Sequence, residues 1–299
     1  MKKILLVKIG LISVIGLNGC NSAIKLDNFK PKTMQKSGYG PTKEEFSTKN
    51  KKVAIIKLDN KGVRLAKLLN LGGIISRQIK SDLSSTGTYS VITKSSKSDI
   101  DKEKFKYVID GRINDTTYQY KYLAPAPALL ITGKTVMSPA QHQYKACTNG
   151  IIEIYKLPSL EVVKSIPFDK CETETEGTYK SARTNNNILI KNSARVAIKS
   201  ISVDLKNFFA EKGYILEQKT DGEKDIVKTT LGKKSGAKEG EEIEFYAINE
   251  SESKFIGKGK ISNQITNNNS WVIVEKLNDG VELKSGDFIK IKYEKGFFD

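Results

Sequence analysis

The chain has 299 residues, a formal net charge of +16 and an apolar fraction of 38%. This apolar content excludes a disordered chain, and the length is enough for two ordinary domains. The positive charge favours anionic partners. Because the chain contains no run of five Lys or Arg residues, the charge gives no specific sign of nucleic-acid binding.

The chain begins with a short apolar segment. Met1-Lys2-Lys3 precedes the run Ile4–Leu17, and Gly19 and Cys20 follow it. A basic start, an apolar middle and a small residue before a cleavage site predict a secretory signal. A membrane-spanning helix would need roughly 20 apolar residues. An ordinary cleaved signal and a buried core helix are the alternatives to the interpretation that follows.

The stretch Leu17-Asn18-Gly19-Cys20 resembles the lipobox of bacterial lipoproteins. This resemblance implies cleavage before Cys20, a diacylglycerol on its thiol and an acyl chain on its new N-terminus. Asn21 occupies the position where aspartate is the usual inner-membrane retention signal in enterobacteria. The resemblance therefore implies an outer-membrane lipoprotein that faces the periplasm. Anionic lipid headgroups or cell-wall polymers, and not nucleic acid, are then the expected partners of the basic charge.

Residues 20–50 lack any periodic pattern of apolar residues. They contain Pro31, Pro41, Gly38 and Gly40 among lysines, serines and threonines. This composition predicts a flexible tether between the lipid anchor and the fold.

Residues 51–211 show the pattern of an α+β domain. The apolar run 53–58 predicts a buried strand, and apolar spacing over 63–83 predicts an amphipathic helix that ends near Gly87. The elements expected next are strands at 89–92 and 107–113, a hairpin of 148–156 and 161–168, and a helix at 187–211. A strand–helix–strand order favours a mixed sheet with flanking helices.

The chain has three cysteines. With Cys20 assigned to lipid, Cys147 and Cys171 remain for one disulfide in an oxidising compartment. Pairing Leu157 with Glu161 in the hairpin places Cys147 opposite Cys171, and a bulge at the turn would shift this register by one residue. Two reduced, buried thiols are the alternative.

Short strands and glycine turns fill residues 212–299. The expected strands are 215–217, 226–231, 242–248, 257–264, 271–276 and 288–293. This spacing predicts a small all-β barrel. Gly240 and Gly286 each stand before an acidic residue and a strand, and we expect both to supply turn geometry.

Several of these segments resemble one family of envelope domains. The segments are Val53–Leu58, Gly87–Ile92, Tyr107–Ile113 and Ile151–Val163. They resemble the domain shared by the curli secretion channel (CsgG), the TolB N-terminal domain, the penicillin-binding-protein activator LpoB and the flagellar H-ring protein FlgT. Residues 212–299 resemble the SH3-like C-terminal barrel of FlgT-type proteins. The resemblance implies a binding domain, and ring-shaped homo-oligomers around a flagellar or secretion machine.

The sequence carries little that could perform catalysis. His142 is the one histidine, so neither a histidine triad nor a multi-histidine metal site can form without it, and we expect it in a polar loop. Asp110 and Asp115 are the candidate carboxylate pair. The sequence predicts no enzyme, no metal and no cofactor apart from the lipid on Cys20.

Residues 118–143 form the most unusual segment. The candidates for partner binding are Tyr118, Tyr120, Tyr122, Leu129, Leu130 and Ile131. We expect a loop that contacts a neighbouring subunit or another protein; a loop packed on its own domain is the alternative. The curli channel family has a membrane-crossing hairpin here, which needs roughly 9–11 alternating residues per strand. Pro125, Pro127 and Pro139 interrupt that alternation.

These features together predict a lipid-anchored, non-enzymatic scaffold or assembly protein of an outer-membrane-associated complex. Such a protein would act as a homo-oligomer within an envelope protein complex, as in a flagellar H-ring or a secretion-machine ring. The alternatives are a curli-type secretion channel and an LpoB-like activator of a cell-wall synthase.

Overall fold

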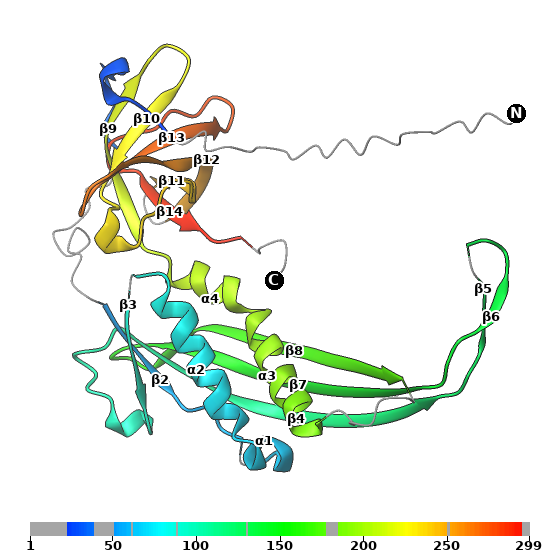
Figure 1. Cartoon of the computed structure of the whole chain (residues 1–299). Helices are drawn as coiled ribbons and strands as arrows, with labels where there is room; N and C mark the ends of the chain where they lie inside the picture. The colour runs from blue at the N-terminus through cyan, green and yellow to red at the C-terminus, as the bar shows by residue number, and fades with distance from the viewer. Residues whose placement is uncertain are drawn as a thin grey trace, which may run out of the picture.

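A computed structural model describes residues 23–38, 51–60, 62–87, 89–129, 131–177, 185–249 and 252–294. Cys20 and Leu130 lie outside these residues. The described part is rich in β-structure, with a five-stranded mixed sheet, a closed barrel of six strands and few helices (Figure 1). It is therefore more strongly β than the expected α+β fold. No helix of the described part has the length and apolar character needed to cross a membrane.

The mixed sheet has the order β3-β2-β4-β7-β8. Its strands are β2 (Lys51–Ile56), β3 (Tyr89–Lys94), β4 (Tyr107–Leu123), β7 (Gln141–Lys156) and β8 (Glu161–Gly177), with the 3-10 turn η2 (Lys97–Asp99) after β3. β2 is parallel to β3 and β4, whereas β4, β7 and β8 are antiparallel. Every strand expected in this part is present, and β4, β7 and β8 are much longer than predicted.

Helices cover one face of this sheet (Figure 1). They are α1 (Arg64–Leu68), α2 (Leu71–Ser84), α3 (Asn186–Lys199) and α4 (Ser202–Phe209). Each predicted long helix is in fact two helices. The first breaks at Asn70, which adopts a left-handed φ of 53°, a conformation that asparagine tolerates. The second breaks after Ser200, whose hydroxyl donates to the Ala197 carbonyl and competes with helical hydrogen bonding.

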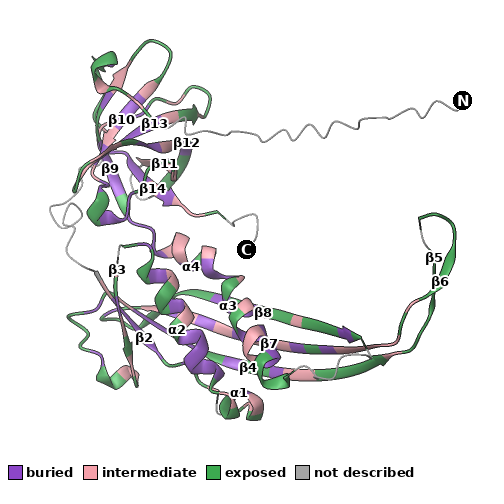
Figure 2. Cartoon of the chain, in the orientation of Figure 1, coloured by how far each residue is buried: buried purple, intermediate pink, exposed green. Residues whose placement is uncertain are grey.

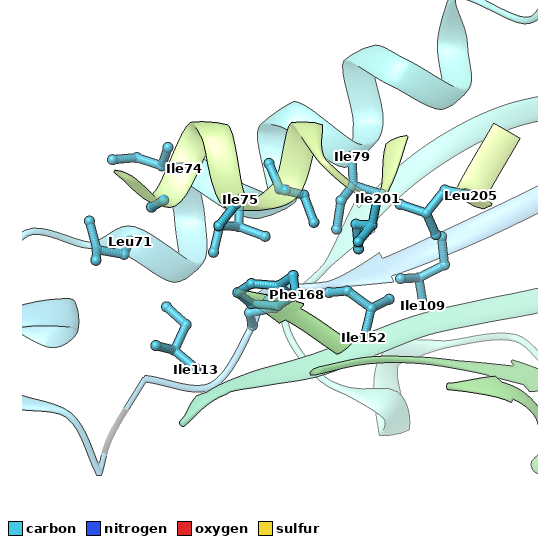
Figure 3. Packing of buried hydrophobic residues seen from close by; sticks show 14 of the residues in the cluster. Leu71, Ile74, Ile75, Ile79, Ile109, Ile113, Ile152, Phe168, Ile201 and Leu205 are labelled. Carbon is cyan, nitrogen blue, oxygen red and sulfur yellow. The ribbon is translucent and has the colours of Figure 1, made fainter. Parts of the chain in front are cut away.

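The core lies between the helices and the sheet. Figure 3 shows Ile75, Ile79, Ile201 and Leu205 of the helical layer beside Ile109, Ile152 and Phe168 of the strands. All of these side chains are buried. The alternation of buried residues along β7 directs one face of that strand toward α3.

The predicted disulfide is present, between Cys147 and Cys171 with an S–S distance of 2.08 Å. The register at the turn differs from the prediction, because Lys156 and not Leu157 pairs with Glu161. A bulge beside Ile154 shifts the register back by one residue, so the two cysteines face each other as predicted.

The barrel is closed in the order β9-β10-β13-β12-β11-β14, with β14 pairing back to β9. Its strands are β9 (Lys212–Thr220), β10 (Asp225–Thr229), β11 (Glu242–Asn249), β12 (Glu252–Ile265), β13 (Ser270–Leu277) and β14 (Phe288–Lys292), with the 3-10 turn η3 (Lys233–Ser235) after β10. Gly240 and Gly286 have φ values of +80° and +98°, which confirms their expected role in turns.

Residues 23–38, which we term the strap, are part of the barrel. The strap contains the 3-10 turn η1 (Leu26–Asn28) and the strand β1 (Lys30–Lys32), and β1 pairs with β9. Phe29 is buried at 8% exposure and packs with Trp271 and Ile226. The prediction of a flexible tether over 20–50 is therefore wrong for the strap. Its few apolar side chains insert singly into the barrel surface, which leaves no periodic pattern to detect.

Phe29→Ala is expected to lower the free energy of unfolding of the barrel by about 3 kcal/mol, because it removes a buried aromatic ring. Urea denaturation followed by the fluorescence of Trp271, the single tryptophan, measures this change. Lys36→Ala, at an exposed strap position, is the control and should change the midpoint little. A flexible tether would instead leave both variants as stable as the parent protein.

Candidate protein-binding arm

The outer parts of β4, β7 and β8 extend beyond the helical layer as a three-stranded ribbon (Figure 1). We term this ribbon the arm; it comprises residues 116–129, 131–148 and 170–177. The strands remain paired along it, from Thr116 with Thr148 to Leu123 with Gln141, and from Lys170 to Gly177 in β8. A small hairpin of β5 (Pro127–Leu129) and β6 (Thr135–Met137) forms its tip.

An aromatic row covers one face of the arm. Tyr118, Tyr120 and Tyr122 alternate in β4 and so share a face. Tyr144 and His142 lie directly opposite Tyr120 and Tyr122 in β7. The Tyr120 ring lies 5.4 Å from that of Tyr144 and 5.8 Å from that of His142, and the Tyr122 ring lies 5.5 Å from His142.

The row continues the buried face of the sheet into solvent. Tyr144 belongs to the core, whereas Tyr120 and Tyr122 are 54% and 51% exposed. The Tyr120 hydroxyl and His142 Nδ1 share a hydrogen bond of 2.8 Å, which fixes the outer rings relative to each other. Burial raises the pKa of the Tyr118 hydroxyl, and Tyr144 and Glu176 add to the effect.

The tip is exposed to solvent (Figure 2), and several of its side chains are apolar. Leu129 is 75% exposed, Met137 is 64% exposed, and Ile131 and Val136 are also exposed. The hairpin itself is ordered by hydrogen bonds, since the Ser138 hydroxyl donates to the Ala126 carbonyl and accepts from its amide. Leu129 and Met137 share one face of the hairpin, and exposed apolar side chains on an ordered hairpin are typical of an interaction surface.

The charge of the arm is divided between its strands. Residues 116–152 contain no Asp or Glu, so the charged or titratable side chains in the outer part of β4, in the tip and in the outer part of β7 are lysines and one histidine. The edge strand β8 carries Glu172, Glu174 and Glu176 opposite Ala146, Tyr144 and His142. The tip is therefore apolar, the residues next to it in β4 and β7 are basic, and the glutamates of β8 make the adjacent edge of the arm acidic.

The structure separates the predicted partner-binding residues into two groups. Tyr118, Tyr120 and Tyr122 lie in the aromatic row, and Leu129 and Ile131 lie at the tip. Leu130 is outside the described residues. The segment predicted as a loop is largely strand.

Sequence reasoning missed four members of these surfaces: His142, Tyr144, Val136 and Met137. His142 lies in β7 and not in a polar loop. The signal was present, because His142, Tyr144 and Ala146 alternate with polar residues just as the three tyrosines of β4 do.

The candidate catalytic groups do not come together. Asp110 pairs with Lys97 at 2.8 Å, and the Asp115 carboxylate accepts from the amide of Thr116. Five residues along a strand span about 17 Å, well beyond the roughly 9.5 Å upper limit for a catalytic carboxylate pair.

Two cavities of about 550 and 380 Å³ lie on the barrel beside the strap, and His142 lines neither. Among the described residues, no three His, Cys, Asp or Glu side chains are grouped to hold a metal.

Comparisons with known proteins give no family. No family model and no curated protein matches the chain. The PelC dodecamer from Paraburkholderia phytofirmans is 16% identical, with 51% of this chain and 86% of that chain covered and a TM-score of 0.31. A neuraminyllactose-binding hemagglutinin homolog from Helicobacter pylori is 15% identical, with 57% and 89% covered and a TM-score of 0.34. A minor lipoprotein from Acinetobacter baumannii is 15% identical, with 52% and 92% covered and a TM-score of 0.25. Similarities at this level carry no conclusion about this chain.

Proposed function

We propose that this chain is a lipid-anchored, non-enzymatic scaffold of an outer-membrane-associated complex, and that its arm holds a partner protein in the periplasm. The arm carries the proposal, because it extends two adjoining exposed surfaces, the aromatic row and the apolar tip, away from the body of the protein. The lipobox-like segment at Cys20 and the disulfide of Cys147 fit an exported protein in an oxidising compartment.

The construction of the arm suits it to reach a partner. Strand pairing is continuous on both sides of β7 along the arm, and the disulfide joins β7 to β8 at its root. An ordered ribbon loses less conformational entropy on binding than a mobile loop would. The aromatic side chains of the row are of the kind enriched at protein interfaces. A neighbouring copy of this chain or a different envelope protein is the proposed occupant.

The double variant Leu129→Ser/Met137→Ser is expected to lose most crosslinks to the native partner without losing stability. Both side chains are exposed, so their removal changes the contact surface and not the core. In-cell crosslinking with a photoreactive residue at position 135, which pairs with Leu129 and shares its face of the hairpin, measures the yield, which should fall about tenfold if two central apolar contacts are lost.

Val162→Ser/Val163→Ser is the matched control, because these exposed valines lie at the turn end of β8, away from the tip. The control should keep the parent yield. If both double variants crosslink equally well, the tip is not the contact surface and the proposal fails.

A curli-type channel is the second candidate. The inner halves of β4 and β7 belong to the core, and the paired outer part of β4, residues 116–123, approaches the roughly 9–11 residues that a membrane-crossing strand needs. Conductance across liposomes containing the lipidated protein tests this candidate. Intact oligomers that give no conductance would exclude it.

A further inference from the structure

Only a short length of chain separates Cys20 from the first strap residue that is bound to the barrel. The backbone of Ile24 is held on both sides, since its amide donates to Asn263 Oδ1 at 2.9 Å and its carbonyl accepts from Gln264 Nε2 at 3.2 Å. Four residue steps separate Cys20 from Ile24, and a fully extended chain covers at most about 14 Å in that number of steps. A lipid on Cys20 would therefore hold the barrel close to the bilayer surface.

The contacts of the strap define which side of the barrel would face the bilayer. Ile24, Leu26 and Phe29 pack on the outer surface of β10 and β13, in a cluster with Ile226, Trp271 and Ile273. Lys219 Nζ lies 5.1 Å from the centre of the Trp271 ring. We term this side of the barrel, comprising the strap, Lys219 and Trp271, the strap face.

The strap is basic. Four lysines, Lys25, Lys30, Lys32 and Lys36, stand against one acid, Asp27, and all five are exposed. Lys32 is paired with Asp225 at 2.8 Å, whereas Lys25 and Lys30 lie beside the anchored residue Ile24 and Phe29. Lysines near a bilayer are attracted to anionic lipid, and the attraction fades within a Debye length of the surface.

We propose that the strap face lies on the anionic phospholipid headgroups of the membrane that holds the anchor, with Lys25 and Lys30 contacting the phosphates. This inference rests on the proposed lipid anchor at Cys20. The barrel is then the membrane-proximal unit, and the strap is a short, fixed coupling in place of a flexible tether.

A chemically lipidated protein tests the docking directly. Because Cys147 and Cys171 form the disulfide, a chain that starts at Cys20 has one free thiol, which can take a maleimide lipid. The protein is placed on phosphatidylglycerol or phosphatidylcholine vesicles that contain a headgroup-labelled quencher, and the emission of Trp271 is recorded. We expect Trp271 to be quenched about threefold more on the anionic vesicles, where lysines add to the anchor.

Charge reversal tests the role of the lysines. Lys25→Glu/Lys30→Glu is compared with Lys258→Glu/Lys276→Glu, which has the same charge change at exposed positions of β12 and β13. Lys276 is five residues along β13 from Trp271, a rise of about 17 Å. Without lipid on Cys20, the strap variant should bind phosphatidylglycerol vesicles about tenfold more weakly, and the control variant should be within about twofold of the parent.

Different results would overturn the docking of the strap face and the proposed lipid anchor at Cys20. Equal quenching of Trp271 on both vesicle types, or equal losses in the two double variants, would overturn the docking of the strap face. Circular dichroism of each variant establishes that it is folded. Mass spectrometry of the native protein that finds no lipid on Cys20 would overturn the proposed anchor, while the vesicle binding of the strap face is measured independently of it.

Discussion

Cys147→Ser/Cys171→Ser is expected to lower the free energy of unfolding by about 3 kcal/mol. The disulfide joins residues separated by 24 positions, so its loss returns the chain entropy of that loop to the unfolded state. Because the bond lies at the root of the arm, the outer part of β8 should also lose protection against amide hydrogen exchange. Guanidinium denaturation and exchange mass spectrometry measure the two effects.

The neighbouring cross-strand pair supplies the control for this prediction. Lys145 lies opposite Thr173 in the same two strands, and both are exposed. Lys145→Ser/Thr173→Ser should cost less than about 0.5 kcal/mol, as exposed substitutions usually do. An equal loss in both double variants would show that strand pairing, and not the covalent bond, stabilises the root of the arm.

Phe209→Ala is expected to destabilise the protein by about 4 kcal/mol, in the range for deletion of a buried aromatic ring. Phe209 is 1% exposed and packs edge-to-face on Tyr89, Tyr107 and Phe208, with ring centres 5.3, 5.6 and 5.0 Å away. It ends α4 just before β9 begins, so its loss should also loosen the junction between the sheet and the barrel. Urea denaturation and limited proteolysis measure the two changes.

Phe208→Ala is the control variant: it removes an aromatic contact next to Phe209 but should leave the junction between α4 and β9 intact. Phe208 is half-buried and contacts Tyr107 at 5.7 Å, so its removal should cost less than half as much. The side chain of Asn207 donates from Nδ2 to the Tyr293 carbonyl at 2.9 Å and accepts at Oδ1 from the Tyr293 backbone amide at 2.8 Å, and both hydrogen bonds should persist in the Phe208 variant. New cleavage near residue 211 in this variant, at the level seen for Phe209→Ala, would contradict the role of Phe209 in holding the junction between the sheet and the barrel.

Sequence reasoning recovered the elements whose side chains follow a regular period. The near-continuous apolar run of β2 and the spacing of apolar residues in α2 and α3 identified their types. The facing positions of Cys147 and Cys171 also followed from the hairpin register. These features depend on local patterns, which a single sequence contains.

The arm was missed as strand for a physical reason. Pro125, Pro127 and Pro139 indicated a loop, but they lie around the tip hairpin and not within the ladder of β4 and β7. The aromatic row depends on pairing between Tyr122 and His142, which are distant in sequence. A single-strand pattern does not reveal such a pair.

The strap was missed because its contacts are almost all with distant segments. Ile24 binds Asn263, and the Ser37 amide donates to the Ser285 carbonyl. Local composition describes only the strap itself, which has the prolines and lysines of a linker. The surface that holds it belongs to the C-terminal strands.

The strap also fixes an order of events during synthesis. Its contacts with Asn263 and Ser285 join the two ends of the chain across more than two hundred residues, and contacts of such separation form late. While the chain is being made, the surface that will hold residues 23–38 does not yet exist. The strap is thus exposed first and becomes part of the barrel only after the last strands have been made. A truncated chain that ends before β14 would keep its N-terminal segment exposed to proteases.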